Sequence, residues 1–425
     1  MSELVLLKHI THPDSTDIEF YEKNGGYQGL KQVLSDYSPD QVIETIKTSN
    51  LRGRGGAGFP TGMKWSFVPK SDGKIHYLCC NADEGEPGTF KDRLLMERDP
   101  HRVIEGMIIA AYAIQSQVAY IYIRGEYGLS IEKISQAIKA AYARGYLGKN
   151  IFGSRFCLDI YIHKGAGAYI CGEETALLES IEGKRGQPKL KPPFPAVSGL
   201  YGCPTVVNNV ETLACVAHIF ARGVDWFTAI GPEDAPGPRL FGLSGRLQNP
   251  GIYELPMGLS LRELVFDYGG GPLTGQLKAV IPGGLSAPMI PLAGLDVKMN
   301  FADLAAADSM MGSAAVIALD ETTSIPVIGR RIAEFFSHES CGKCTPCREG
   351  LHWASKILNR IESGQGRPGD LEQLQVLCGG IFNNSFCALG VGASWAIGAT
   401  LKHFSHEYDA LITQQTIPVR DRTRL

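Results

Sequence analysis

Residues 75–93, Ile75-His-Tyr-Leu-Cys-Cys80-Asn81-Ala-Asp83-Glu84-Gly-Glu86-Pro-Gly-Thr-Phe-Lys-Asp92-Arg93, join an apolar run to an acidic loop. The run from Ile75 to Cys80 predicts a buried strand, because it is short, continuous and apolar. Helices and strands then alternate along the chain. We predict a helix at 101–114, a strand at 118–123, a helix at 130–144 with Ser130 as N-cap, a strand at 156–163 and a helix at 173–181. This alternation predicts an α/β fold with a parallel sheet covered by helices.

The loops that follow the predicted strands are the expected ligand-binding segments, because ligands bind beyond the carboxyl ends of parallel strands. The acidic loop at 81–93 follows the first strand. A second segment, Gly165-Ala-Gly-Ala-Tyr169-Ile-Cys-Gly172-Glu173-Glu174-Thr175, follows the third strand and provides a glycine turn and a helix start. Both segments are candidate parts of one site.

A third candidate is the stretch Leu51-Arg-Gly-Arg-Gly-Gly-Ala-Gly-Phe-Pro-Thr-Gly-Met-Lys-Trp-Ser-Phe67, which is rich in glycine and contains Arg52, Arg54 and Lys64. Glycine lets the backbone approach a ligand closely, and we expect the amides and cations to face an anion. The stretch therefore predicts a loop that covers a phosphate-bearing cofactor.

The glycines at 53, 55 and 58 nominally match the dinucleotide fingerprint, which has physical meaning only between a strand and a helix. A helix precedes them instead. Ser38 fits an N-cap, Pro39 the first helical position and Gln41 the capping box. The standard fingerprint is therefore excluded at this position, whereas a ligand-covering loop is not.

We predict four segments: an N-terminal segment with the glycine-rich loop (1–70), a ligand-binding α/β domain (71–235), a small mixed β domain of the grasp type (236–325) and a helical bundle (326–425). Prolines and glycines at 231–238 indicate the second boundary. The proline-rich passage 183–212 predicts a stiff loop rather than a helix or strand, and Asn209 is the expected N-cap of a helix at 210–222.

Composition excludes several classes of protein. The 425 residues are 44% hydrophobic with a net charge of −3, which gives no long-range attraction to nucleic acid. No apolar run is long enough to span a bilayer, and no secretion signal is recognisable at the N-terminus. We therefore expect a cytoplasmic protein with reduced cysteines and no direct membrane insertion.

Three of the eleven cysteines, Cys341, Cys344 and Cys347, lie within seven residues. Tandem spacing of this kind with a remote fourth cysteine is typical of iron–sulfur clusters, whereas zinc sites usually use two separated pairs. We therefore expect a [4Fe–4S] cluster rather than three structural thiols. The fourth ligand is either Cys378 or Cys387, and the non-helical context of Cys387 favours it modestly.

Two aromatic residues and several carboxylates accompany the glycine-rich stretch. Phe59 and Phe67 suit stacking on a flat ring, although single phenylalanines are more often core residues. Four carboxylates, Glu84, Glu86, Glu173 and Glu174, suit either a solvated rim or the recognition of ribose hydroxyls, and the second role would favour NAD over NADP.

Five strings resemble the NADH- and FMN-binding flavoprotein subunit of respiratory complex I, the bacterial F subunit. They begin at Arg52, Asn81, Gly165, Val207 (Val-Asn-Asn-Val-Glu-Thr212) and Glu339 (Glu-Ser-Cys-Gly-Lys-Cys-Thr-Pro-Cys-Arg-Glu349), and the similarity runs from about residue 40 to 410. The resemblance implies a Rossmann-like FMN-binding domain, a ubiquitin-like β-grasp domain and a helical bundle that carries one [4Fe–4S] cluster.

The resemblance also implies the site residues. FMN would be held by Gly53, Arg54, Gly55, Lys64, Asn81, Asp83, Tyr169, Gly172, Glu173, Asn208, Asn209 and Thr212. NADH would meet Phe59, Phe67, Glu86, Glu174, Lys191 and Phe194. The cluster ligands would be Cys341, Cys344, Cys347 and Cys387.

The implied reaction passes a hydride from NADH to FMN and single electrons to the cluster and onward toward quinone. Hydride transfer requires contact between the two rings, so no catalytic acid or base is expected. The implied partners are a small thioredoxin-like [2Fe–2S] subunit (the E subunit) and a larger iron–sulfur subunit, peripheral on the cytoplasmic side of the membrane. A diaphorase subunit of an NAD-linked hydrogenase or formate dehydrogenase and a non-catalytic scaffold are the alternatives.

Overall fold

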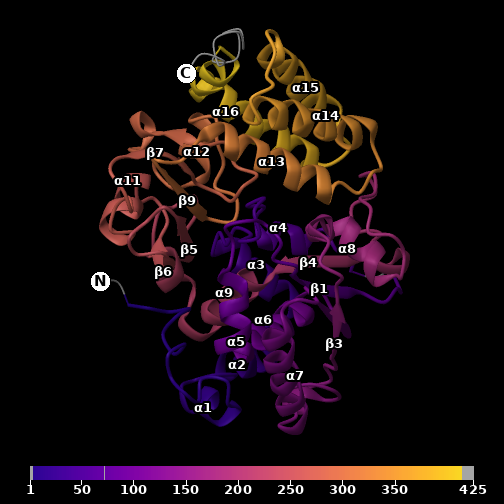
Figure 1. Cartoon of the computed structure of the whole chain (residues 1–425). Helices are drawn as coiled ribbons and strands as arrows, with labels where there is room; N and C mark the ends of the chain where they lie inside the picture. The colour runs from indigo at the N-terminus through magenta and orange to yellow at the C-terminus, as the bar shows by residue number, and fades with distance from the viewer. Residues whose placement is uncertain (1–2, 71, 414–425) are drawn as a thin grey trace, which may run out of the picture.

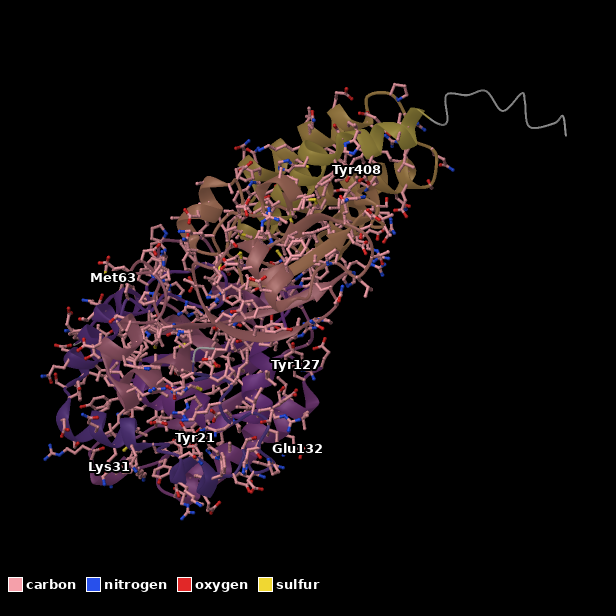
Figure 2. All side chains as sticks on the ribbon, turned by 90° about the vertical axis from the view of Figure 1, so that its left-hand side faces the viewer. Tyr21, Lys31, Met63, Tyr127, Glu132 and Tyr408 are labelled. Carbon is pink, nitrogen blue, oxygen red and sulfur yellow. The ribbon has the colours of Figure 1, made fainter. Side chains whose placement is uncertain are left out.

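A computed structural model describes residues 3–70 and 72–413. The molecule is elongated, with Tyr21, Lys31 and Glu132 toward one end and Tyr408 near the other (Figure 2). An α/β domain forms the lower half of Figure 1, a smaller mixed-sheet unit lies beside it, and a bundle of helices covers the top. The N-terminal segment is held against the mixed-sheet unit, because buried Glu254 accepts hydrogen bonds from the amides of Val5, Leu6 and Leu7.

The α/β domain contains a four-stranded parallel sheet in the order β3-β2-β1-β4. Its strands are β1 (Tyr77–Ala82), β2 (Val118–Ile123), β3 (Asp159–Lys164) and β4 (Thr205–Asn209). The helices around it are α1 (Ile18–Lys23), α2 (Gln28–Asp36), α3 (Pro39–Thr48), α4 (Thr61–Ser66), α5 (Lys91–Arg98), α6 (Pro100–Ala113), α7 (Gly128–Ala143), α8 (Glu174–Ile181), α9 (Val210–Arg222) and α10 (Val224–Thr228). The predicted α/β fold with a parallel sheet is therefore confirmed.

The alternation of side chains along each strand decides which helices cover which face. Leu78 and Cys80 of β1 belong to the core shared with α6 and α9, whereas Cys79 belongs to a second core with Leu177 of α8. Close packing between α6 and α9 depends on Gly106, since a Cβ there would lie 1.9 Å from the carbonyl oxygen of Leu213.

The mixed-sheet unit has five strands in the order β6-β5-β9-β7-β8, with both parallel and antiparallel pairs. They are β5 (Pro238–Gly245), β6 (Gly251–Pro256), β7 (Leu277–Ile281), β8 (Ile290–Pro291) and β9 (Ala315–Asp320), with helices α11 (Leu261–Glu263) and α12 (Phe301–Ala306). A π-helical turn at Leu264–Tyr268 continues α11. These strands and helices enclose a core of their own.

The C-terminal helices are α13 (Ile325–Glu339), α14 (Thr345–Glu362), α15 (Asp370–Asn384) and α16 (Ala388–Thr413). Their apolar faces form one cluster that continues to α8 of the α/β domain. The predicted helical C-terminal segment is confirmed as far as Thr413, the last residue that the structure describes. In Figure 1 the loop between α13 and α14 approaches the region of α8.

Two local predictions hold in atomic detail. Ser38 and Gln41 form the capping box of α3, and the Asn209 side chain accepts the amide hydrogen of Glu211 at the start of α9. The helix before the glycine-rich loop thus excludes the dinucleotide fingerprint, as expected.

Other predictions were wrong. Ser130 is not an N-cap, because α7 begins at Gly128, and its buried hydroxyl donates to Glu97 instead. Residues 205–209 are a strand and not a stiff loop, since β4 pairs in parallel with β1. Helices α1, α2, α4, α5 and α10 had no counterpart in the prediction, and α4 lies within the stretch 51–67 that was predicted to be a loop.

Candidate functional site

The glycine-rich loop lies at the carboxyl end of the sheet, next to β4. The amide of Gly53 donates to the carbonyl oxygen of Phe59 at 2.9 Å, so the loop closes on itself. Gly55 packs against Asn209, where a Cβ would come within 3.0 Å of the asparagine Cβ. Gly56 has φ +124° and open space beside it. The loop therefore offers bare backbone toward the space above β4.

Two of the cations that we expected to face an anion, Arg52 and Arg54, bind other parts of the protein instead. The Arg54 guanidinium is fully buried and donates to the carbonyl oxygen of Pro236 at 2.8 Å, while its amide donates to Thr212 Oγ1 at 2.8 Å. Arg52 donates to the carbonyl oxygen of Gly58 and stacks over the Phe301 ring at 4.2 Å. Both arginines therefore hold the loop to the protein, and the prediction that they face a ligand was wrong.

Asparagine and aspartate side chains gather where β1 and β4 end, because the two strands are parallel neighbours. Asn81 Nδ2 donates to the carbonyl oxygen of Gly172 at 2.9 Å, which ties β1 to the turn before α8. Asn208 Oδ1 accepts the indole N–H of Trp65 at 2.8 Å. The predicted residues Asn81, Gly172, Asn208, Asn209 and Thr212 thus lie around one end of the sheet.

The site carries a buried acceptor without a partner. Within the described residues, Asp83 Oδ2 makes no hydrogen bond, and burial raises the pKa of Asp83 to about 7. A hydrogen-bond donor on a bound molecule would stabilise a buried acceptor of this kind. Flavins and their ribityl chains offer N–H and O–H donors, so the residues present fit an FMN at this place.

Glu173 is the N-cap of α8. Its Oε2 accepts hydrogen bonds from the amides of Thr175 and Ala176 at 2.8 and 3.0 Å, and its Oε1 accepts one from Lys191 Nζ at 3.1 Å. The bonds of Oε2 are therefore structural, and a carboxylate at a helix start also complements the helix dipole.

Glu174, the next residue, lies between two ammonium groups. Lys191 Nζ is 2.6 Å from Oε1, and Lys64 Nζ is 3.3 Å from Oε2 and 3.2 Å from the carbonyl oxygen of Val207. Burial alone would raise the pKa of Glu174, but the two cations outweigh it and lower the pKa below its usual range. Glu174 is therefore a carboxylate at neutral pH.

Three exposed aromatic residues lie within five residues of the two lysines in the sequence. Phe59, Phe67 and Phe194 are 45%, 50% and 58% exposed, far more than core phenylalanines. The centroids of Phe59 and Phe67 lie 6.3 Å apart with tilted planes. Their exposure supports a role in stacking rather than in the core.

Glu86 connects the acidic loop to two other segments. Its Oε2 accepts the hydroxyl of Tyr169 at 2.5 Å, and its Oε1 accepts the amide of Ser286 at 2.7 Å. Burial raises the pKa of Glu86. The hydrogen bonds place Tyr169 and Glu86, predicted for FMN and NADH respectively, side by side.

Glu84 is neither a solvated rim residue nor a free acceptor for a ribose. It is buried and accepts hydrogen bonds from the amides of Asp92 and Arg93 at 2.8 and 3.1 Å, and from the Tyr127 hydroxyl at 3.1 Å. Both expectations for Glu84 are therefore wrong, because its carboxylate caps the first turn of α5.

The four predicted cluster cysteines come together between the α/β domain and the bundle. Cys341 and Cys344 lie in the α13–α14 loop, Cys347 lies in the first turn of α14 and Cys387 directly precedes α16. Burial raises the pKa of Cys347 to about 11, Ser340 opposes this, and the nearby Cys344, Cys387 and Cys341 contribute to the rise. The thiols must therefore lose protons when a cluster binds.

Cys378 lies in α15, and burial is the sole cause that raises its pKa to about 12. Among residues 3–70 and 72–413, no three His, Cys, Asp or Glu side chains are arranged to hold a single metal ion. A cluster attaches its thiolates to different iron atoms, so its cysteines need not converge on one point. The donor set, four cysteine thiols that lie near one another, is the one that [4Fe–4S] clusters use.

Sequence reasoning missed the polar network behind the loop. Asn209 Nδ2 donates to Asp92 Oδ2 at 2.6 Å, and buried Lys91 lies 2.8 Å from Asp92 Oδ1 and 2.7 Å from Glu211 Oε2. The available signal was the charged pair Lys91-Asp92 at the end of the acidic loop. This network fixes the orientation of Asn209.

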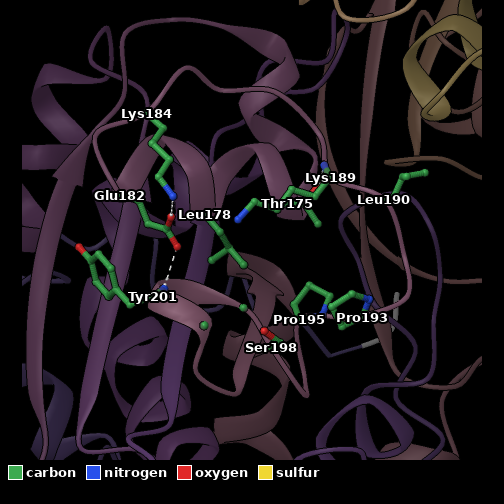
Figure 3. A pocket seen from close by; sticks show the side chains of 12 residues that line it. Thr175, Leu178, Glu182, Lys184, Lys189, Leu190, Pro193, Pro195, Ser198 and Tyr201 are labelled. Atoms are coloured by element: carbon green, nitrogen blue, oxygen red, sulfur yellow. Dashed lines mark hydrogen bonds and ion pairs between the residues drawn. The ribbon is translucent and has the colours of Figure 1, made fainter.

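A pocket of about 530 Å³ lies between α8 and residues 184–202 (Figure 3). Leu178, Leu190, Pro193, Pro195 and Tyr201 line it, and Glu182 accepts the Tyr201 amide at 2.7 Å within it. None of the predicted site residues lines this pocket, although Thr175 and Leu190 are sequence neighbours of Glu174 and Lys191.

Comparison with known proteins agrees with the two halves of this site. The family model of the Nuo51 FMN-binding domain matches residues 46–218, and that of the NADH-ubiquinone oxidoreductase-F iron-sulfur binding region matches residues 328–411. An FMN-binding α/β domain followed by an iron–sulfur region defines a flavin- and iron–sulfur-containing oxidoreductase subunit.

The relatives specify the family. The second of the NADH-quinone oxidoreductase F subunits of Rhizobium meliloti is 61% identical over 98% of this chain and all of its own length. The corresponding F subunit of Escherichia coli is 47% identical over 93% of this chain and 90% of its own. The chain belongs to the family of NADH-quinone oxidoreductase F subunits.

A solved NAD⁺-reducing [NiFe]-hydrogenase in the H₂-reduced state has a similar structure, with TM-score 0.84 and 37% identity. The match covers 93% of this chain and 66% of the hydrogenase chain, so this chain spans about two thirds of the length of that chain. Among the described residues, no helix has the length and apolar character required to cross a membrane.

Proposed function

We propose that this chain is the NADH-oxidising F subunit of a multi-subunit NADH-quinone oxidoreductase. The single observation that carries the proposal is that one segment reaches both the charged site and the cysteines: its Lys191 pairs with Glu174, and its Arg185 and Gln187 donate to the carbonyl oxygen of Cys341. Family membership over the whole chain supports it. Bound FMN would supply the conversion between two-electron and one-electron transfer.

The flavin would be held by backbone and side chains at the end of the sheet. Gly53 and Gly55 allow close approach, Asp83 supplies the unpartnered acceptor, and Asn208 is oriented by Trp65. The remaining proposed contacts are Arg54 through its backbone, Lys64, Asn81, Tyr169, Gly172, Glu173, Asn209 and Thr212. Hydrogen bonds between Arg54 and Thr212 and between Asn81 and Gly172 hold these residues in place before the cofactor binds, which lowers the entropic cost of binding.

The nucleotide would lie along Phe59, Phe67 and Phe194, with Glu86, Glu174 and Lys191 around its hydroxyls and phosphates. An ionised Glu174 accepts hydrogen bonds from ribose hydroxyls and repels a 2′-phosphate, so NADH is the proposed substrate rather than NADPH. No side chain is assigned as a general acid or base, because the protein's task is to align two rings.

Cys341, Cys344, Cys347 and Cys387 would hold the [4Fe–4S] cluster. Proposed partners are a small [2Fe–2S] subunit and a larger iron–sulfur subunit, with the assembly on the cytoplasmic side of the membrane. We also propose the boundaries 1–70, 71–235, 236–325 and 326–425. Helices α11 and α12 beside a mixed five-stranded sheet support a β-grasp assignment for the third segment.

The test measures the NADH–ferricyanide activity of the native purified protein, and then the FMN and iron that the protein releases when it is denatured. We expect about one flavin and four irons per chain. Absence of both flavin and activity would leave the scaffold alternative.

A diaphorase subunit of an NAD-linked hydrogenase is the second candidate, favoured by the structural similarity to the hydrogenase chain. Co-purification decides between the two. A complex with quinone-reductase subunits supports our proposal, whereas a complex with a nickel-containing subunit supports the alternative.

A further inference from the structure

The segment between α8 and β4, residues 182–204, contacts the cysteine loop as well as the nucleotide site. Near its start, Gln187 Nε2 and Arg185 Nη2 both donate to the carbonyl oxygen of Cys341, at 3.0 and 3.1 Å. In return, Lys343 Nζ donates to the carbonyl oxygen of Pro188 at 2.5 Å. Three hydrogen bonds therefore hold the loop that carries the first cysteine of the proposed cluster to this segment.

A few residues later, the same segment carries two proposed nucleotide contacts. Lys191 Nζ is 2.6 Å from Glu174 Oε1 and 3.1 Å from Glu173 Oε1, and Phe194 is largely exposed. A nucleotide whose hydroxyls and phosphates compete for Glu174 and Lys191 must rearrange this ion pair. Lys191 is only three residues after Pro188, whose carbonyl oxygen accepts the hydrogen bond from Lys343 of the cysteine loop.

The segment has open space beside it into which it can move when a nucleotide binds. The pocket of about 530 Å³ separates part of it from α8, and Leu190 is 72% exposed (Figure 3). A segment with few buried contacts moves more easily than the sheet and helices around it. The end of α13, two residues before Cys341, is also held independently of this segment, because Glu339 Oε2 accepts the amide of Tyr169 at 2.9 Å.

We infer that residues 185–194 link nucleotide binding to the iron–sulfur site, with Gln187 and Arg185 as positioning residues for Cys341. The inference rests on the proposed function, since it requires a nucleotide at Lys191 and a cluster at Cys341. Nucleotide binding alters the hold of Gln187 and Arg185 on the Cys341 carbonyl group, and the cluster environment changes with it.

Electrostatics predicts the direction in which each substitution shifts the midpoint potential of the cluster. Hydrogen-bond donors and positive charge near a cluster ligand stabilise the reduced, more negative state and raise the midpoint potential. Removal of the Gln187 donor therefore lowers the potential. Arg185 is exposed, so solvent and salt screen its charge and its contribution is the smaller of the two.

The experiment is a redox titration of the purified protein monitored by electron paramagnetic resonance, with and without ADP-ribose. This nucleotide lacks the nicotinamide and cannot be reduced. The variants are Gln187→Leu, Arg185→Met and Arg185→Lys. Gln136→Leu and Arg155→Met are the controls with the same residue changes. Both residues are exposed; Gln136 lies in α7, and Arg155 lies between α7 and β3. Calorimetry checks that each variant binds ADP-ribose, and flavin content checks its fold.

In the wild type, ADP-ribose should shift the midpoint potential or the line positions of the cluster signal. Gln187→Leu should lower the potential and reduce the ADP-ribose shift at least twofold, Arg185→Met should do so more weakly, and Arg185→Lys and both controls should behave as wild type. Loss of iron from Gln187→Leu with flavin retained also supports the positioning role.

Identical potentials, spectra and ADP-ribose shifts in Gln187→Leu, Arg185→Met and wild type would overturn the inference while leaving the proposed function intact. A wild-type cluster that does not respond to bound ADP-ribose would overturn the link as well. A wild-type protein without flavin and iron would overturn both the inference and the proposed function.

Discussion

Lys191 Nζ lies 2.6 Å from Oε1 of Glu174, while Lys64 approaches the other carboxylate oxygen at 3.3 Å. This carboxylate between two cations comes from three segments that are far apart in sequence: α4, the start of α8 and the segment before β4. Because each lysine interacts with one oxygen, Glu174 keeps its charge and a fixed orientation.

Glu174→Gln should increase the use of NADPH relative to NADH. The amide keeps the shape of the side chain but does not repel a 2′-phosphate, so we expect the NADPH/NADH ratio of kcat/KM to rise about tenfold, or ~1.4 kcal/mol. Steady-state ferricyanide reduction measures this ratio. Glu132→Gln, on the exposed side of α7, is the control and should leave it unchanged. An unaltered ratio in Glu174→Gln would refute the assigned role.

Phe67→Ala should raise the KM for NADH without loss of flavin. Aromatic stacking contributes about 0.5–1.5 kcal/mol, so we expect an increase of about twofold to thirteenfold. Phe67 is half exposed, and its removal should change the unfolding free energy little. Phe266→Ala removes an exposed ring from the mixed-sheet unit and serves as the control. Equal KM values for the two variants would contradict stacking at Phe67.

Asp83 should make the flavin-free protein less stable as pH rises. Burial raises the pKa of Asp83 from 3.8 to about 7, so the folded state binds this proton more strongly than the unfolded state. Its contribution to the unfolding free energy therefore falls as pH rises between about 4 and 7, by up to ~1.4 kcal/mol per pKa unit.

Urea unfolding of flavin-stripped protein at pH 5 and pH 8 tests this effect. Asp83→Asn should be more stable than wild type by a larger margin at pH 8 than at pH 5. If the margin is the same at both pH values, Asp83 does not titrate in this range.

Cys387→Ala should abolish the cluster signal in electron paramagnetic resonance while flavin remains bound. Removal of one of four thiolates leaves an iron atom without its protein ligand. Cys378→Ala is the matched control, because Cys378 is a buried thiol in α15. The assignment of Cys387 fails if the signal disappears in Cys378→Ala instead.

Gly106→Ala should destabilise the α/β domain by about 1–3 kcal/mol, because the new Cβ would lie 1.9 Å from the Leu213 carbonyl oxygen and force α6 away from α9. Gly128→Ala, also in a helix but with nothing within 4 Å, should be neutral or stabilising by up to about 1 kcal/mol. Chemical denaturation measures the unfolding free energy of both variants. Equal values would show that α6 and α9 move apart without cost and would contradict the prediction.

Local patterns in the sequence predicted much of the fold. The strand at 118–123, the capping box at Ser38 and the Asn209 cap appear as expected, because periodicity and capping depend on residues close together in the chain. The family motifs likewise pointed to the glycine, asparagine and cysteine residues that the fold gathers around the site.

Only the tertiary structure decided how charged and polar groups are paired. Arg54 turns inward to Pro236, Glu84 caps α5, and β4 forms beside β1 in a passage whose prolines had indicated a loop. A charged side chain is buried only where distant segments supply its partners, so its orientation depends on the whole fold. The sequence by itself predicted a nucleotide role for Lys191 and a cluster role for Cys341. Only the folded chain showed that one segment contacts both Glu174 and the Cys341 carbonyl group, because these contacts join residues that are far apart in the sequence.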